Sequence, residues 1–126
     1  MNMRILVVDD SLTMRKIITN VLKELGVHHE LIIEAADGMD AIGKVKTHSF
    51  DLILTDWNMP KMNGLELVQN LRKLPKTEKT PIIMITTEGA KTEVVTALKN
   101  GVNNYIVKPF TAEILKSKLQ PFIEGN

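Results

Sequence analysis

The sequence predicts an α/β fold in which a mainly parallel sheet is covered by helices on both faces. Short β-branched apolar runs alternate with longer stretches of helical spacing along the whole chain. Three of these runs, at 5–8, 52–55 and 81–86, are almost continuously apolar, which is typical of strands buried on both faces. Strands that alternate with helices favour a parallel sheet with right-handed crossovers. No linker-like segment interrupts the alternation, so we expect residues 1–126 to form one domain.

The expected strands are short, mostly apolar segments rich in β-branched residues. In chain order they are Ile5–Val8, Leu31–Glu34, Leu52–Thr55, Pro81–Thr86 and Tyr105–Val107.

The first two expected helices have apolar residues three or four positions apart, the spacing of a helix face that packs on a core. The stripe of the first helix consists of Met14, Ile17, Ile18, Val21, Leu22 and Leu25. Gly26 is placed to end this helix, because glycine readily adopts the left-handed conformation that follows a helix. The second helix is marked by Ala41, Ile42 and Val45.

The last three expected helices carry clear end signals. Asn63-Gly64-Leu65-Glu66 has the pattern of a capping box, and it precedes a core face of Leu67, Val68 and Leu71. The fourth helix has Val94, Val95 and Leu98 and ends at Asn100-Gly101. Thr111 can cap the fifth, whose apolar positions are Ile114, Leu115, Leu119 and Ile123.

Composition excludes several classes of function. Lys and Arg total 16 against 15 acidic residues, and a net charge of +1 argues against strong nonspecific binding to nucleic acid or anionic membrane. Without cysteine there is neither a disulfide framework nor a thiolate zinc site. The first apolar run is about five residues long, whereas a signal peptide needs ~7–15 and a membrane span ~20. We therefore expect a cytoplasmic protein.

Polar residues follow the strands at the edge of the sheet where α/β proteins bind ligands. Asp9-Asp10 follows the first strand, and Asp56 follows the third. The fourth ends in Thr86-Thr87-Glu88, and the fifth is followed by Lys108-Pro109. If the first and third strands are neighbours, three carboxylates converge at this edge.

Three close carboxylates repel one another, and their pKa values rise unless a cation intervenes. A site with few protein oxygens suits Mg²⁺ better than Ca²⁺, which takes 6–8 oxygen ligands. With Lys108 and the Thr86 hydroxyl nearby, such a site suits an incoming phosphoryl group.

Each of these residues also has an ordinary structural interpretation when taken alone. Asp10 could cap the first helix, Thr86 could bind backbone, Lys108 could be a surface charge, and Tyr105 could be a half-buried packing residue. The agreement of four strand ends favours the functional interpretation. No Gly-rich loop follows the first strand, so neither a P-loop nor a dinucleotide-binding motif is present.

The segments LVVDDSLTMR, LILTDWNMPKMNGLELV, PIIMITTE and NNYIVKPFT resemble the motifs of bacterial response-regulator receiver domains, most closely those of the CheY-type chemotaxis regulators. The resemblance covers essentially the whole chain, in order and spacing. It implies a doubly wound, flavodoxin-like sheet of five parallel strands in the order 2-1-3-4-5 with five helices, an order inherited from the family. One departure is Ser11-Leu12, where CheY-type proteins often carry an aromatic residue.

The resemblance also implies roles for the residues at the strand ends. Asp56 matches the phosphoacceptor, and the metal ligands would be Asp9, Asp10, Asp56 and the main-chain carbonyl of Asn58. Asp10 would bind Mg²⁺ directly and Asp9 through water. Lys108 matches the lysine that binds the phosphoryl group, and its bond to Pro109 is expected to be cis.

The remaining roles concern switching and output. Thr86 matches the switch hydroxyl and Tyr105 the aromatic residue that swings inward. Asn58 and Glu88 would flank the water that hydrolyses the acyl phosphate and tune its rate. The expected output surface consists of Lys91, Val94, Tyr105 and Lys118, an aromatic anchor with aliphatic and basic neighbours that suits an acidic amphipathic partner.

The function implied is that of a monomeric response regulator phosphorylated on Asp56 by a histidine kinase, with catalysis limited to its own phosphorylation and dephosphorylation. The expected output partner is the flagellar motor switch, and a phosphatase is a further possible partner. One alternative is a phosphorelay intermediate or phosphate sink without a motor target. Another is a phosphohydrolase of the haloacid-dehalogenase type, but those enzymes carry an acid two residues after the nucleophile, where this chain has Asn58.

Overall fold

The computed structural model describes residues 3–123, which contain a five-stranded sheet in the order β2-β1-β3-β4-β5. All neighbouring strands pair in parallel, which confirms the fold class and the strand order. The strands are β1 Ile5–Val8, β2 Ile32–Ala35, β3 Leu52–Thr55, β4 Ile82–Thr86 and β5 Asn104–Val107.

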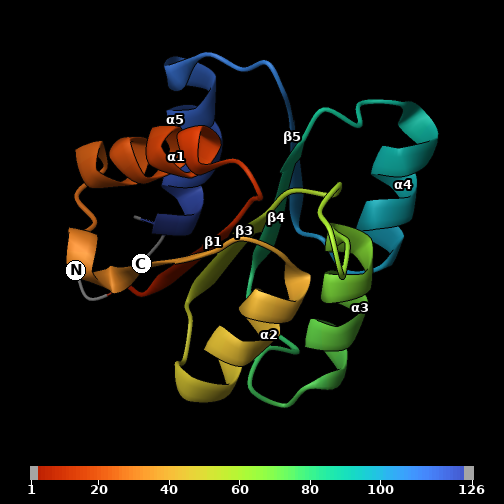
Figure 1. Cartoon of the computed structure of the whole chain (residues 1–126). Helices are drawn as coiled ribbons and strands as arrows, with labels where there is room; N and C mark the ends of the chain where they lie inside the picture. Colours follow the sequence, from red (N-terminus) through yellow and green to blue (C-terminus); the bar gives the residue numbers. More distant parts are fainter. Residues whose placement is uncertain (1–2, 124–126) are drawn as a thin grey trace.

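Helices cover both faces of this sheet (Figure 1). They are α1 Leu12–Glu24, α2 Gly38–Thr47, α3 Gly64–Lys73, α4 Lys91–Lys99 and α5 Ala112–Ile123, with a short 3-10 turn at His29–Leu31 before β2. In Figure 1, α1 and α5 lie on one side of the sheet, and α2, α3 and α4 lie on the other. Among the described residues, none of the helices is both long and apolar enough to cross a membrane.

The sheet separates two hydrophobic cores, and successive residues of a strand contribute to them in turn. Ile5 and Val7 of β1 belong to the core that includes residues of α1 and α5, whereas Leu6 and Val8 belong to the core that includes residues of α2, α3 and α4. All four are buried. Because both faces of the central strands are covered, these strands read as continuous apolar runs in the sequence.

Strand boundaries differ from the predicted ones by a single residue. Leu31 belongs to the 3-10 turn, so β2 runs one residue later than expected. Pro81 lies just outside β4, although its carbonyl still accepts a hydrogen bond from the Ile53 amide at 3.0 Å. Asn104 begins β5 opposite Ile83, because its backbone continues the ladder despite its polar side chain.

The helix ends follow the predicted capping chemistry. Ser11 caps α1, its hydroxyl accepting from the Met14 amide at 3.1 Å, so Asp10 is not the cap. Asn63 and Glu66 form the reciprocal capping box that begins α3. Thr111 Oγ1 accepts a hydrogen bond from the Ile114 backbone amide at 3.1 Å. The glycines that follow α1 and α4, at positions 26 and 101, have φ angles of 99° and 105°, which suits their helix-ending role.

Four of the apolar residues that mark the expected first, fourth and fifth helices are exposed in the structure. They are Ile17, Val95, Leu98 and Ile114, with exposed fractions of 41%, 38%, 46% and 47%. Each apolar stripe was wider than the line of contact between its helix and the sheet. In α4, only Ala97 is buried, and Val94 packs on the core from the side.

Gly64, the first residue of α3, lies against the backbone that leads out of β3. A Cβ added there would lie 1.9 Å from the Asp56 carbonyl oxygen, whereas one added at Gly43 in α2 would meet no heavy atom within 4 Å. We expect Gly64→Ala to lower the free energy of unfolding by about 3 kcal/mol or more, the upper end of overpacking costs. Gly43→Ala is the matched control and should stabilise the protein by up to about 1 kcal/mol, since alanine favours helix interiors. Urea denaturation measures both, and equal effects of the two substitutions would contradict the close approach at Gly64.

Candidate functional site

The parallel sheet brings the ends of β1 and β3 together. Val8 is paired with Thr55, and the Asp56 amide donates to the Val8 carbonyl at 3.0 Å. The acidic residues that follow each strand, Asp9 and Asp56, are therefore neighbours. The polar ends of β4 and β5 lie on the same side of this pair, since the strands run parallel.

Asp9, Asp10 and Asp56 form a cluster in which each residue offers one carboxylate oxygen, all within 4.8 Å of one another. This confirms the convergence of three carboxylates that the sequence predicted. Asp9 and Asp56 are 1% and 8% exposed, whereas Asp10 lies on the surface. The cluster is thus buried on the sheet side and open to solvent beside Asp10. Such a set of oxygen donors suits a hard divalent cation.

Lys108 reaches this cluster from the end of β5. Its Nζ donates to Asp9 Oδ2 at 2.8 Å and to Asp56 Oδ2 at 3.0 Å, and its side chain is 11% exposed. Burial by itself lowers the pKa of Lys108, but the hydrogen bonds to the two carboxylates and their charges raise it above the ordinary value. Lys108 is therefore a largely buried cation of the site and not a surface charge. The Lys108-Pro109 bond is cis, as expected.

The two buried carboxylates are also held by backbone amides. Asp9 Oδ1 accepts from the Ser11 amide at 2.9 Å, and Asp56 Oδ1 accepts from the Trp57 amide at 2.6 Å. Burial raises the pKa of Asp9 above its ordinary value, against the opposing effects of the hydrogen bonds from Lys108 and Ser11. The Lys108 ammonium group and these amides thus supply the site's own stabilisation of negative charge.

On the β4 side of the site, three residues contact Glu88. Asn58 Nδ2 donates to Glu88 Oε2 at 2.9 Å, and the Glu88 amide donates to Thr86 Oγ1 at 3.4 Å. The hydroxyl of Tyr105 donates to the Glu88 main-chain carbonyl. Thr86 is fully buried. The structure therefore links Asn58, Thr86 and Tyr105 through one residue of the β4–α4 loop.

Tyr105 is turned inward and is 8% exposed, so it offers little surface in this conformation. Of the other residues of the expected output surface, Lys91 and Lys118 are exposed and Val94 is half-buried against the core. Val107, which is not among the residues of the expected output surface, is 43% exposed. Alternation along β5 places Val107 on the same face of the sheet as Tyr105, a period-two signal that could have identified it.

Comparison with known proteins gives consistent results. Residues 5–120 match the response regulator receiver domain family. A chemotaxis protein CheY homolog from Campylobacter jejuni (strain 81-176) is 57% identical over 119 residues, covering 94% of this chain and 90% of its own length.

Two solved structures are also similar. The chemotaxis response regulator CheY4 of Vibrio cholerae is 34% identical, with a TM-score of 0.88 over 97% of this chain and 99% of its own. The receiver domain of a sensor histidine kinase from Pseudomonas aeruginosa PAO1, with a magnesium ion coordinated in its active site cleft, is 27% identical. Its TM-score is 0.85 over 98% of this chain and 99% of its own.

Tyr105 is the only tyrosine of the chain, so its ionisation can be followed directly by ultraviolet absorbance. Burial, followed by the charges of Glu88, Glu93 and Asp56, raises its pKa to about 12 from the ordinary value of 10.0. We expect a native midpoint near 12 in rapid pH jumps and near 10 in urea. A native midpoint near 10 would contradict the buried, hydrogen-bonded phenol.

The same shift predicts how stability depends on pH. The unfolded chain releases the phenolic proton at lower pH than the folded protein does. The contribution of Tyr105 to the free energy of unfolding is therefore fully present below pH ~10 and is lost as the pH rises towards ~12. Urea denaturation of the parent and of Tyr105→Phe across this range measures the contribution, which the phenylalanine variant should lack.

Proposed function

The chain belongs to the response regulator receiver family as a CheY-type regulator of a two-component system, and we propose that it signals by accepting a phosphoryl group on Asp56. The observation that carries this proposal is the position of Asp56. Its carboxylate lies within 4.8 Å of two other carboxylates and 3.0 Å from the ammonium group of Lys108.

The phosphoryl donor is a phosphohistidine of a partner kinase. An oxygen of the Asp56 carboxylate forms the new O–P bond, the P–N bond of the phosphohistidine breaks, and the leaving imidazole takes up a proton. The product is an acyl phosphate on Asp56. The chain catalyses only this transfer and the later hydrolysis, so it acts as a signalling protein.

A divalent cation fits the carboxylate cluster, and we assign it as Mg²⁺. The three carboxylate oxygens within 4.8 Å of one another are hard donors, and Lys108 supplies a single positive charge against the three carboxylates. Asp10 and Asp56 would bind the ion directly, Asp9 through water, and Asn58 through its main-chain carbonyl. When bound, Mg²⁺ neutralises charge on the transferring oxygens. The similar P. aeruginosa receiver domain with magnesium in its active site cleft supports this assignment.

The acyl phosphate adds negative charge beside Lys108. In the proposed switch, Lys108 Nζ binds a phosphoryl oxygen and the Thr86 hydroxyl donates to another. Tyr105 is then held inward, where it contacts the Glu88 carbonyl. Phosphorylation thus shifts the population towards one conformer of the surface formed by α4, β5 and α5.

Hydrolysis of the acyl phosphate ends the signal. The Asn58 amide and the Glu88 carboxylate, which are hydrogen-bonded to each other, flank the approach of water to Asp56 and tune its rate. A dedicated phosphatase would act at the same place.

The output partner is the flagellar motor switch, bound at the surface of Lys91, Val94 and Lys118, beside which Tyr105 is held inward. The similarity to chemotaxis proteins favours this partner over the alternative of a phosphorelay intermediate or phosphate sink. The hydrolase alternative lacks support, because Asn58 occupies the position of the second acid. We propose that residues 1–126 act as one receiver domain and as a monomer.

The first test concerns the nucleophile. Incubation with acetyl phosphate and Mg²⁺ is expected to add one phosphoryl group, detected by mass spectrometry and removed by hydroxylamine. Asp56→Asn keeps the shape of the side chain but lacks the attacking oxygen anion, so labelling should fall below detection. Asp51→Asn, a carboxylate before β3 at the other end of that strand, is the control and should label normally. Undiminished labelling of Asp56→Asn would assign the phosphoacceptor to another residue.

The second test concerns the output surface. Lys118 is exposed on α5, and its reversal to glutamate places a negative charge against an acidic partner. We expect Lys118→Glu to weaken binding of a motor-switch peptide about tenfold in the presence of beryllofluoride, a loss of ~1.4 kcal/mol. Lys46→Glu on α2, across the sheet from α5, carries the same change of charge and should have little effect. Fluorescence anisotropy measures both, and equal losses would show that only net charge matters.

A further inference from the structure

Arg15 of α1 contacts the backbone of the carboxylate cluster. Its Nη1 donates to the main-chain carbonyl of Asp9 at 2.7 Å, and its Nε donates to Glu34 Oε1 at 2.8 Å. The Arg15 side chain is only 15% exposed. The planar guanidinium group therefore bridges two fixed points, the turn after β1 and the edge strand β2.

The contact with the Asp9 carbonyl bears on the orientation of Asp10. The Asp9–Asp10 peptide is planar, so fixing its oxygen also fixes the direction in which the chain continues to the Asp10 Cα. The Asp9 amide is held as well, because it donates to the Ala35 carbonyl at 3.1 Å. Backbone groups on both sides of Asp9 are thus anchored before the chain reaches exposed Asp10.

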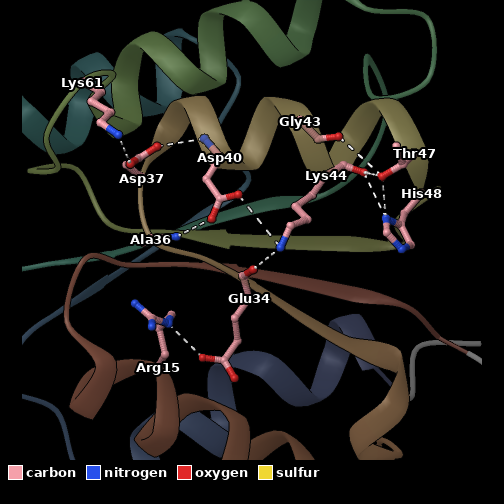
Figure 2. A network of polar contacts seen from close by, with 10 residues as sticks. All are labelled: Arg15, Glu34, Ala36, Asp37, Asp40, Gly43, Lys44, Thr47, His48 and Lys61. Atoms are coloured by element: carbon pink, nitrogen blue, oxygen red, sulfur yellow. Dashed lines mark hydrogen bonds and ion pairs between the residues drawn. The ribbon is translucent and has the colours of Figure 1, made fainter.

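Glu34 is itself held from the opposite side of the sheet (Figure 2). The Nζ of Lys44, in α2, donates to the Glu34 main-chain carbonyl at 3.0 Å and lies 3.9 Å from Asp40 Oδ1. Asp40 Oδ2 in turn accepts from the Ala36 amide at 3.1 Å. The residue that orients Arg15 is therefore fixed by contacts from another helix.

We propose that Arg15 is a positioning residue for the divalent-cation site: by holding the Asp9 carbonyl, with Glu34 orienting its guanidinium group, it directs the Asp10 carboxylate towards Asp9 and Asp56. The inference rests on the metal site of the proposed function and adds to it a residue that contacts no metal. Residues that orient ligands in this way typically contribute 10–100-fold to metal affinity.

The charge of Arg15 distinguishes this role from simple electrostatics. A cation near three carboxylates repels Mg²⁺, so removing it would tighten Mg²⁺ binding if charge alone mattered. If Arg15 instead positions Asp10, its removal has the opposite effect and weakens Mg²⁺ binding. Arg15→Lys separates the two effects further, because lysine keeps the charge but lacks the planar fork that bridges Asp9 and Glu34.

The experiment is a titration with Mg²⁺ that follows the fluorescence of Trp57, the only tryptophan, which directly follows Asp56. Arg15→Ala and Arg15→Lys are expected to raise the Kd for Mg²⁺ about tenfold. Lys16→Ala, which removes a positive charge from an exposed neighbour on the same helix, is the matched control. Its Kd should be unchanged or slightly lower. Circular dichroism confirms that each variant is folded, and Arg15→Lys decides the question if Arg15→Ala is not.

The possible outcomes separate this inference from the function on which it rests. A parent protein whose fluorescence responds to Mg²⁺, with unchanged or tighter binding in both Arg15 variants, overturns the positioning role alone. A parent protein that does not respond, or responds equally well as Asp10→Ala, overturns the metal site and the inference together. Weaker binding in both Arg15 variants beside an unaffected Lys16→Ala supports the proposal.

Discussion

The Lys108 ammonium group lies 2.8 and 3.0 Å from the carboxylates of Asp9 and Asp56, at a place where all three side chains are largely buried. Buried charges require partners, because removing one member of a buried ion pair leaves an uncompensated charge at a cost of ~3–5 kcal/mol. The three residues come from the ends of β1, β3 and β5, which are far apart in the sequence. The sheet order brings them together, so the charge balance of the site depends on the strand topology.

This arrangement also bears on the proposed switch, in which one group added to Asp56 affects a distant surface. Lys108 is bound to two carboxylates, and its backbone amide donates to the Thr86 carbonyl at 2.8 Å. A phosphoryl group on Asp56 would offer this lysine a more highly charged partner beside the fully buried Thr86. Only a difference in contacts between two conformers can shift their populations. In the proposed switch, Lys108 and Thr86 supply that difference, since Lys108 Nζ lies 3.0 Å from Asp56 Oδ2 and the Lys108 amide is bound to the Thr86 carbonyl.

The sequence predicts the fold well because its signals are local. Apolar runs, caps and helix-ending glycines depend on neighbouring residues, and the strand ends that carry Asp9, Asp56 and Lys108 follow from them. Contacts between distant segments leave no such pattern. Arg15 and Glu34 are 19 residues apart, and neither stands out in the sequence. The exposure of Ile17 was likewise unpredictable from periodicity, because it depends on how α1 rotates against the sheet. Strand order came from family resemblance alone.

Glu88 forms hydrogen bonds with Asn58 and Tyr105 through chemically different groups. Its side-chain carboxylate accepts a hydrogen bond from the Asn58 side-chain amide, whereas its main-chain carbonyl accepts one from the Tyr105 hydroxyl. Every amino acid supplies that carbonyl, but few supply a carboxylate at the same distance. A substitution at position 88 would therefore change what the Asn58 amide contacts and leave the acceptor for the Tyr105 hydroxyl in place. The side chain at position 88 can thus tune the hydrolysis proposed at Asp56 separately from the contact that holds Tyr105 inward.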